Sequence, residues 1–281
     1  MRTLDFTDHR RSLNDNHYVY AVVSRRVGGL SIGINLNPDK TCNFSCPYCQ
    51  VDRTIPGGPR QIDLDRLAGE LDGLLGFVSD GSLWDRAPFN TAALHLRRVG
   101  DISFAGDGEP TAAREFMESV ARVVEVRDRH DLKDVRLSLL TNATLFHRAN
   151  VQKGLNVLDS AGGQVWAKLD AGSQEWFERV DGTQLSLDRI MDNIILAAQR
   201  YRVVIQSMFH AFNDEGPSDE EIAAWVDRLS TVVTAGGTIE EVQVYTVART
   251  PADASVKALS AERLDWIAEH ARSAGLNAHV Y

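Results

Sequence analysis

Apolar segments typical of strands alternate with segments typical of helices along this 281-residue chain, and this alternation limits its fold most. The six strand-like segments are residues 30–36, 101–105, 135–140, 164–169, 201–208 and 242–247. Parallel strands need helical crossovers between them, and the fixed handedness of those crossovers favours a rolled sheet. The pattern predicts an α/β fold in one domain with a barrel-like sheet, and a doubly wound open sheet is the alternative.

Apolar residues at helical spacing mark the segments between the strands. The predicted helices lie around residues 64–78, 116–124 and 187–198, and residues 146–158 are predicted to be helical or mixed. Ser218 and Glu221 have the spacing of a capping box, and Ser260 is predicted to cap a last helix. Residues 79–98 fit neither pattern, and residues 18–27 are predicted to form an accessory strand or hairpin before the core.

All three cysteines, Cys42, Cys46 and Cys49, lie in the loop that follows the first core strand, spaced Cys-x3-Cys-x2-Cys. Cysteines that only fill a core are scattered, whereas clustered thiolates favour a soft metal. A structural zinc or an ordinary four-iron cluster takes four protein ligands, so three ligands leave one metal position open. Three-cysteine zinc with a distant histidine, a disulfide plus a thiol, and chance remain alternatives.

The loop, with Tyr48 just before its last cysteine, resembles the signature of the radical S-adenosylmethionine (SAM) enzymes. The resemblance implies a partial (β/α)6 barrel of the TIM type over residues 28–281, after an N-terminal extension of residues 1–27. It also implies that the cysteines hold a [4Fe–4S] cluster whose open iron binds SAM. Reductive cleavage of SAM would then give a 5′-deoxyadenosyl radical that abstracts hydrogen from a substrate.

A glycine-rich turn follows the second core strand and consists of Gly106, Asp107, Gly108, Glu109 and Pro110. Glycines let the backbone approach a ligand closely, and a carboxylate beside them can accept hydrogen bonds from an ammonium group. An ordinary turn would have the same composition. The turn resembles the Gly-Gly-Glu segment with which radical SAM enzymes bind the amino group of SAM, in the variant of wyosine-synthase-like relatives.

Polar residues also end the third and fourth core strands. Asn142 is either a turn residue or a SAM contact. Lys168 and Asp170 share one face of their strand, as an ion pair or as a site for the carboxylate and ribose of SAM. By resemblance, the carbonyl of Tyr48 receives the adenine amino group, and Phe44 covers the cluster.

Further polar side chains stand near the ends of the last two core strands, where parallel α/β folds place their active sites. They are Gln206, His210, Gln243, Tyr245 and Arg249. We expect Gln206 to contact SAM and Tyr245, together with Asp170, to take part in catalysis. Solvent-facing loop residues are the alternative for each of them.

The composition restricts the class of partner. The chain carries 39 acidic and 30 Lys or Arg residues, a net charge of −9, which disfavours nucleic acid without excluding a local basic patch. Hydrophobic residues make up 43% of the chain, and no run is long enough for a signal sequence or a membrane span. We therefore expect a cytoplasmic protein with no membrane partner, reduced by an external donor such as flavodoxin or ferredoxin.

The substrate is the least constrained part of the prediction. No cysteine remains for a second cluster, which disfavours wyosine-type tRNA modification and peptide maturation. Activation of a glycyl-radical enzyme and chemistry on a small molecule need one cluster only and stay open. A non-catalytic iron–sulfur or zinc-binding protein is the alternative from another class.

Overall fold

The chain divides into two compact units in a computed structural model that describes residues 16–24, 27–249, 251 and 253–281. The first unit holds the described residues up to Thr41 together with Arg53–Leu140 and Ala149–Gln164. The second unit holds Cys42–Asp52, Thr141–Arg148 and the described residues from Val165 onward. The cysteine loop therefore belongs to the second unit, although both of its flanking segments belong to the first.

The first unit is built on four strands that lie side by side in the order in which they occur in the sequence. They are β1 (Val19–Ser24), β2 (Gly29–Ile34), β3 (Val99–Phe104) and β4 (Arg136–Thr141). β1 pairs antiparallel with β2 along its whole length, so the predicted accessory strand is present and pairs with the first core strand. β2, β3 and β4 are parallel, as predicted for core strands.

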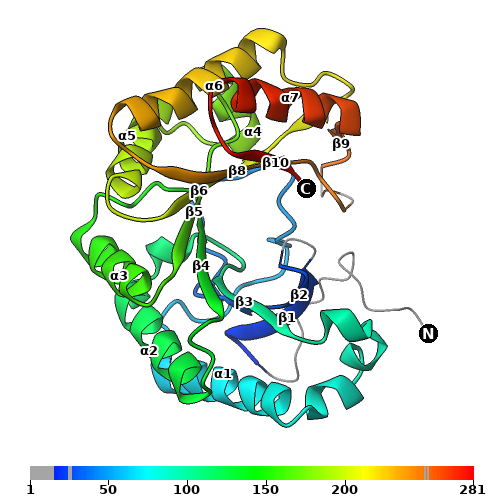
Figure 1. The fold of residues 1–281 in the computed structure, drawn as a ribbon, viewed down its shortest axis with the longest axis vertical. Coiled ribbons are helices and arrows are strands. Elements are labelled where there is room, and N and C mark those ends of the chain that lie inside the picture. Colours follow the sequence, from blue (N-terminus) through cyan, green and yellow to red (C-terminus); the bar gives the residue numbers. More distant parts are fainter. Residues whose placement is uncertain (1–15, 25–26, 250, 252) are drawn as a thin grey trace. The chain divides into compact units, whose positions relative to one another are not determined.

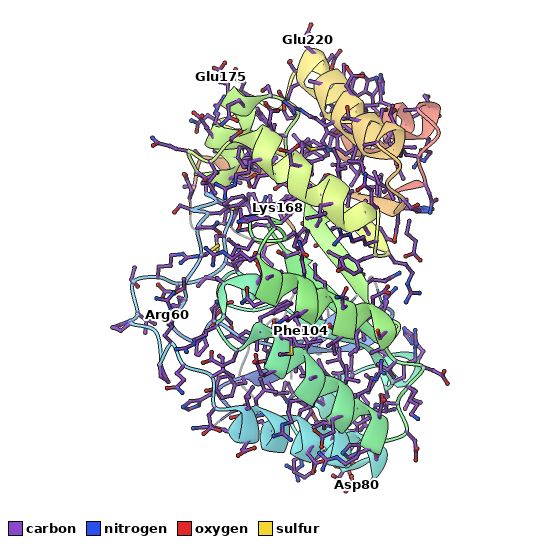
Figure 2. All side chains as sticks on the ribbon, turned by 90° about the vertical axis from the view of Figure 1, so that its left-hand side faces the viewer. Arg60, Asp80, Phe104, Lys168, Glu175 and Glu220 are labelled. Atoms are coloured by element: carbon purple, nitrogen blue, oxygen red, sulfur yellow. The ribbon has the colours of Figure 1, made fainter. Side chains whose placement is uncertain are left out.

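Three helices cover one face of these strands (Figure 1). They are α1 (Leu64–Ser79), α2 (Phe116–Arg129) and α3 (Ala149–Ser160). The predicted apolar face of α1 is confirmed, because Leu67, Leu71, Leu74 and Leu75 are buried. The ring of Phe104, which ends β3, is fully buried in this core (Figure 2). Residues 79–98 contain three short 3-10 helices, η1 (Ser82–Asp85), η2 (Phe89–Thr91) and η3 (Leu94–Leu96).

The second unit has parallel strands that also follow one another in chain order. They are β5 (Gln164–Lys168), β6 (Val203–Met208), β8 (Ile239–Tyr245) and β10 (Ala278–Val280). A separate antiparallel pair joins β7 (His210–Phe212) to β9 (Val256–Ala258). Sequential strand order within each unit differs from a doubly wound sheet, in which the order reverses at a switch point.

The described residues of the second unit form four helices. Each begins at a serine whose side chain accepts a hydrogen bond from a backbone N–H of the first turn. They are α4 (Gln174–Asp181), α5 (Leu187–Ala198), α6 (Asp219–Thr234) and α7 (Ala261–Ser273). The predicted capping box at Ser218 is half formed. Ser218 accepts from the Glu221 N–H, but the Glu221 carboxylate accepts from Gly172 and Ser173 instead of returning to Ser218.

All six predicted core strands are present, and the chain is an α/β protein with parallel strands. The sixth strand ends at Tyr245 rather than at residue 247. Four short elements were not predicted, namely α4, β7, β9 and β10, which have 8, 3, 3 and 3 residues. A short segment contains too few residues to show a period. Among the described residues, no helix is long and apolar enough to cross a membrane.

Candidate functional site

The cysteine loop is anchored within the second unit by the ring of Phe44. This ring is buried and meets Phe177 of α4 edge-on, with 5.6 Å between the ring centroids. A tight turn follows, in which the Cys49 N–H donates to the Cys46 carbonyl at 2.9 Å. The three cysteines are half-buried, and no disulfide joins them. Phe44, predicted to cover a cluster, thus holds the loop against α4.

Each of two cysteine sulfurs has a polar neighbour. The Phe44 N–H donates to Cys42 Sγ at 3.5 Å, and the Asn142 amide nitrogen lies 4.0 Å from the same sulfur. Cys46 Sγ lies 3.6 Å from Asp181 Oδ1. Burial raises the pKa of the Cys46 thiol well above its ordinary value, and Lys168 only partly opposes this. Without metal, the thiol therefore stays protonated and donates to Asp181.

The donor set of this loop fits an iron–sulfur cluster. Three thiols point from one short loop, and N–H groups directed at a cysteine sulfur are among the features that tune cluster potentials. Among the described residues, no three His, Cys, Asp or Glu side chains form a group that could hold a single metal ion. A cluster does not require such a group, because each of its cysteine ligands binds a different iron.

Asn142, at the end of β4, is part of a side-chain network with the cysteine loop. Its amide donates to Asn43 Oδ1 at 2.7 Å, and the Asn43 amide donates to Thr144 Oγ1 at 2.9 Å. Asn142 Oδ1 in turn accepts from the N–H and the hydroxyl of Thr144. These bonds form the turn that was the alternative for Asn142. Contact with SAM stays a prediction.

A buried charged cluster stands beside Cys46 and centres on Lys168. The ammonium group of Lys168 contacts the carboxylates of Asp170 and Asp181 and the hydroxyl of Tyr48. The Tyr48 hydroxyl donates to Asp170 Oδ2 at 2.5 Å, and Asp170 Oδ1 accepts from the Met208 N–H at 2.9 Å. The ion pair, one of the two alternatives for Lys168 and Asp170, is present, and Tyr48 joins it through its side chain. Binding of SAM by these residues stays a prediction.

Charge in this cluster is unbalanced, because two buried carboxylates share one ammonium group. Burial lowers the pKa of Lys168, but Asp170 and Asp181 outweigh it and raise that pKa well above its ordinary value. Burial raises the pKa of Asp181 to about 7 against the opposing effect of Lys168, and Asp170 adds to the rise. Burial, followed by Asp170, also raises the pKa of Tyr48, so this phenol stays a donor.

Asp181 is the functional neighbour that sequence reasoning missed. It is the last residue of α4 and is almost fully buried. The one local signal was the Asp-Gly pair that ends the helix, since Gly182 adopts the left-handed conformation. That signal marks a helix end and does not reveal contacts with Cys46 and Lys168.

The other predicted strand-end residues divide into two groups. Gln206, next to Lys168 in strand register, donates to the buried Gln243 at 3.0 Å. Tyr245 ends β8 opposite Met208, and Arg249 follows in a loop. Gln206 and Gln243 thus form a buried pair on adjacent strands, while the roles predicted for Gln206 and Tyr245 remain predictions.

His210 opens β7 and is buried to 1% exposure. Its ring meets Tyr48 and Phe212 edge-on, with centroid distances of 5.3 and 4.7 Å. Within the described part of the chain, neither ring nitrogen has a hydrogen-bond partner. Burial lowers the pKa of His210, so the imidazole is neutral at pH 7. The alternative of a solvent-facing loop residue is therefore wrong for His210.

The glycine-rich turn lies in the first unit, and the side chain of Glu109 is buried there. Glu109 Oε1 accepts from the Thr111 N–H at 3.0 Å and from the Thr111 hydroxyl at 2.5 Å. This caps the 3-10 helix η4 (Pro110–Ala112). The Glu109 N–H donates to the Thr41 carbonyl at 3.1 Å. Glu109 therefore serves locally as a turn cap, and binding of an ammonium group stays a prediction.

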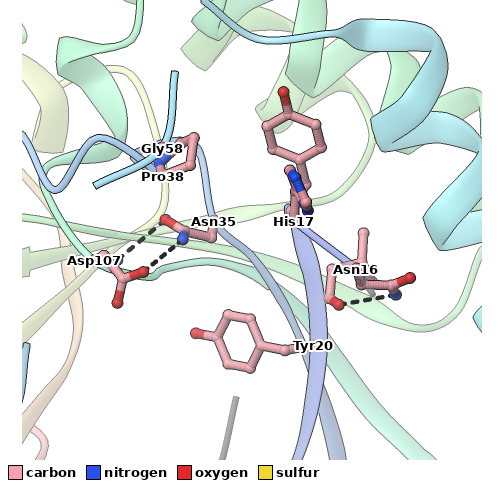
Figure 3. A pocket seen from close by; sticks show the side chains of 9 residues that line it. Asn16, His17, Tyr20, Asn35, Pro38, Gly58 and Asp107 are labelled. Atoms are coloured by element: carbon pink, nitrogen blue, oxygen red, sulfur yellow. Dashed lines mark hydrogen bonds between the residues drawn. The ribbon is translucent and has the colours of Figure 1, made fainter. Parts of the chain in front are cut away.

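Neighbouring atoms lie too close to both glycines of this turn for a Cβ to fit. A Cβ on Gly108 would lie 2.0 Å from the Thr41 carbonyl oxygen, immediately before the cysteine loop. Asp107 accepts from the Asn35 amide at 2.8 Å and donates its N–H to the same side chain at 3.1 Å (Figure 3). Asn35 and Asp107 also line a cavity of about 310 Å³ in this unit.

Comparisons with known proteins give distant similarity. No family model matches the chain. It is 23% identical over 249 residues to "GTPase Obg" of Brachyspira hyodysenteriae and 25% identical over 224 residues to a "UPF0026 protein" of Helicobacter pylori. These matches cover 87% and 78% of this chain but 32% and 65% of the relatives, so the chain spans less than two thirds of their length. No lysine here follows a glycine, as a phosphate-binding P-loop requires.

Solved structures match the fold over almost the whole chain. SuiB of Streptococcus suis has a TM-score of 0.58 at 15% identity, covering 92% of this chain and 51% of SuiB, and SuiB also matches in its complex with S-adenosylmethionine. A radical SAM methyltransferase from Sphaerobacter thermophilus has a TM-score of 0.55 at 14% identity, covering 94% of this chain and 68% of that protein. TYW1 with a bound lysine–pyruvate adduct has a TM-score of 0.55 at 12% identity, and the match covers 93% of this chain and 85% of TYW1. The chain has the fold of radical SAM enzymes.

Proposed function

We propose that this chain is a radical SAM enzyme in which Cys42, Cys46 and Cys49 hold one [4Fe–4S] cluster. The observation that carries the proposal is that three thiols, none of them in a disulfide, lie on one short loop whose Cys46 contacts Asp181 in the buried cluster of Lys168, Asp170 and Asp181. The shared fold supports it. Residues 28–281 then form the core domain, a partial (β/α)6 barrel, after an extension of residues 1–27.

The cluster and SAM together would supply reductive cleavage of SAM to methionine and a 5′-deoxyadenosyl radical. The chain itself supplies position and exclusion of water. Lys168 offers a cation for the carboxylate of SAM, and Asp170 offers a carboxylate for its ribose. Glu109 offers a carboxylate for the ammonium group of SAM. Tyr48 fixes Asp170 through its hydroxyl and presents its backbone carbonyl to the adenine.

The remaining assignments concern the substrate and the reductant. Tyr245, Gln206 and Asn142 are proposed to line the site of hydrogen abstraction or to contact SAM. A one-electron donor of the flavodoxin or ferredoxin class would reduce the cluster. A small molecule or a protein glycine fits the single cluster and the net charge of −9 better than tRNA does.

The decisive experiment is anaerobic. The protein is reconstituted with iron and sulfide, reduced with dithionite and mixed with SAM, and 5′-deoxyadenosine is measured by mass spectrometry. We expect product from the wild type and neither chromophore nor product from Cys46→Ala. A cluster that neither cleaves SAM nor responds to it spectroscopically would indicate a non-catalytic iron–sulfur protein. A colourless protein that binds zinc would overturn the proposal.

Glu109→Gln tests the role of the glycine-rich turn. The amide keeps the size of the side chain and its acceptor oxygen for Thr111 but loses the charge that would bind an ammonium group. Loss of a hydrogen bond to a charged group costs about 1.5–3 kcal/mol, so we expect about 10- to 100-fold weaker SAM binding with an unchanged chromophore. Unchanged SAM affinity and cleavage would remove Glu109 from the site.

A further inference from the structure

Three consecutive residues at the C-terminal end of α4 contact the cysteine loop, namely Asp181, Gly182 and Thr183. We call them the α4 clasp. Asp181 acts twice, because its backbone carbonyl accepts from the Ser45 N–H at 3.1 Å and its side chain meets Cys46 Sγ at 3.6 Å. The Thr183 hydroxyl lies 3.5 Å from the Asn43 carbonyl oxygen. All of these groups belong to the second unit.

Gly182 makes this approach possible. Its φ of +56° lies in the left-handed region, and a Cβ built on it would stand 2.3 Å from the Ser45 carbonyl oxygen. Any side chain at this position would push the cysteine loop away from α4. The backbone contacts of the clasp do not depend on the charge of Cys46, so they hold the loop in the same way with and without metal.

We propose that the α4 clasp positions the cysteine loop for cluster binding, with Gly182 setting the approach of the loop and Asp181 setting the electrostatic surroundings of Cys46. The inference rests on the proposed function, because it assigns the support of the same metal site. It adds that the support comes from a helix end far along the chain, and that Asp181 is a positioning residue that contacts a ligand of the cluster.

Electrostatics gives Asp181 a role beyond holding the loop. Lys168 lies against both Asp170 and Asp181, so two carboxylates face one ammonium group beside Cys46. The charge close to a cluster is one of the factors that set its reduction potential. Removal of one carboxylate charge should therefore make the cluster easier to reduce, while the backbone carbonyl of residue 181 continues to hold Ser45.

Gly182→Ala tests the backbone contact, and Gly236→Ala is its matched control. Gly236 also has a positive φ, +83°, at the end of α6 in the same unit, but a Cβ there meets nothing within 4 Å. Both variants carry the backbone strain of alanine at positive φ, and only Gly182→Ala displaces the loop. Removing a residue that supports a metal ligand typically lowers metal affinity about 10- to 100-fold, and we expect a loss of this size in Gly182→Ala, measured as iron lost to a chelator. Gly236→Ala should retain iron as the wild type does.

Hydrogen exchange of the metal-free protein gives a readout that needs no cluster. The Ser45 amide, bonded to Asp181, should exchange faster in Gly182→Ala than in the wild type and in Gly236→Ala. Retained Ser45 protection together with wild-type iron retention in Gly182→Ala would overturn the clasp. If the wild type bound no iron, the proposed function would fail, and exchange alone would still decide whether the clasp holds the loop.

Asp181→Asn tests the side chain separately. At pH 8.5, where the carboxyl group of Asp181 is ionised, it keeps the size and the backbone carbonyl of residue 181 but removes the charge. Asp188→Asn, on the exposed face of α5, is the control for net charge. We expect a higher reduction potential in an EPR-monitored titration of Asp181→Asn, with Ser45 still protected, and no change in Asp188→Asn. Equal potentials in both variants would refute the electrostatic role of Asp181. A cluster that formed with these properties but neither cleaved SAM nor responded to it spectroscopically would refute the proposed function and leave the clasp standing.

Discussion

At the scale of single residues, a cluster of charged side chains lies beside Cys46 in the second unit. Lys168 and Asp170 were predictable from the sequence, because strand alternation places residues two apart on one face. Asp181 was not, because it reaches Cys46 from a helix 135 positions away in the chain. Local pattern carries no information on such a contact. For the same reason, the sequence could not show that the Tyr48 ring lies against His210.

The raised pKa of Asp181 predicts a pH dependence of stability in the metal-free protein. This pKa is about 7 in the folded state, against 3.8 for a free aspartate. The folded state therefore holds this proton more tightly than the unfolded chain does, so the contribution of Asp181 to the free energy of unfolding falls as pH rises between these two values. The slope is about 1.4 kcal/mol per pH unit.

Asp181→Asn removes this titration, so its free energy of unfolding should fall less between pH 5 and pH 7 than that of the wild type. Urea denaturation of the metal-free proteins at both pH values measures the difference. Asp188→Asn, at an exposed carboxylate, should keep the wild-type slope. Identical slopes for the wild type and Asp181→Asn would show that the carboxyl group of Asp181 is not held protonated.

At the scale of elements, long periodic segments were predictable and short ones were not. The leucines of α1 repeat over 16 residues and gave the helix and its buried face. α4 has only 8 residues, and its contacts with the cysteine loop rather than its periodicity determine its importance. The half-formed capping box at Ser218 has a similar cause. A tertiary partner, the Gly172–Ser173 corner, takes the Glu221 carboxylate that a local rule assigned to the helix end.

Glu221 should therefore matter more than an ordinary cap residue. Its carboxylate accepts from the Gly172 N–H at 2.6 Å and from the Ser173 N–H at 3.2 Å, at the corner that follows Asp170. Glu221→Ala leaves these donors without their acceptor, which costs about 1–3 kcal/mol for each buried group. Ser260→Ala, which removes only the cap of α7, should cost about 1 kcal/mol. Urea denaturation compares the two, and equal losses would contradict the tertiary role of Glu221.

At the scale of the whole molecule, the charge of −9 bears on the class of substrate. A chain that binds tRNA neutralises phosphates with a basic surface. We expect unmodified tRNA to bind at physiological salt no more tightly than a non-specific ligand, with a Kd weaker than about 10⁻⁶ M by fluorescence anisotropy. Saturable binding tighter than this, with a steep salt dependence, would show a local basic surface and restore tRNA as a substrate.

The path of the chain between the two units has a consequence for the order of events during synthesis. Cys46 leaves the ribosome 135 residues before Asp181, its support in the second unit. At ordinary bacterial or eukaryotic speeds this interval lasts on the order of 10 s. During that time the three thiols belong to a nascent segment without its partner helix. The proposed cluster would therefore be loaded only after translation of α4, and until then the emerging thiols would need protection from oxidation and from stray metal ions.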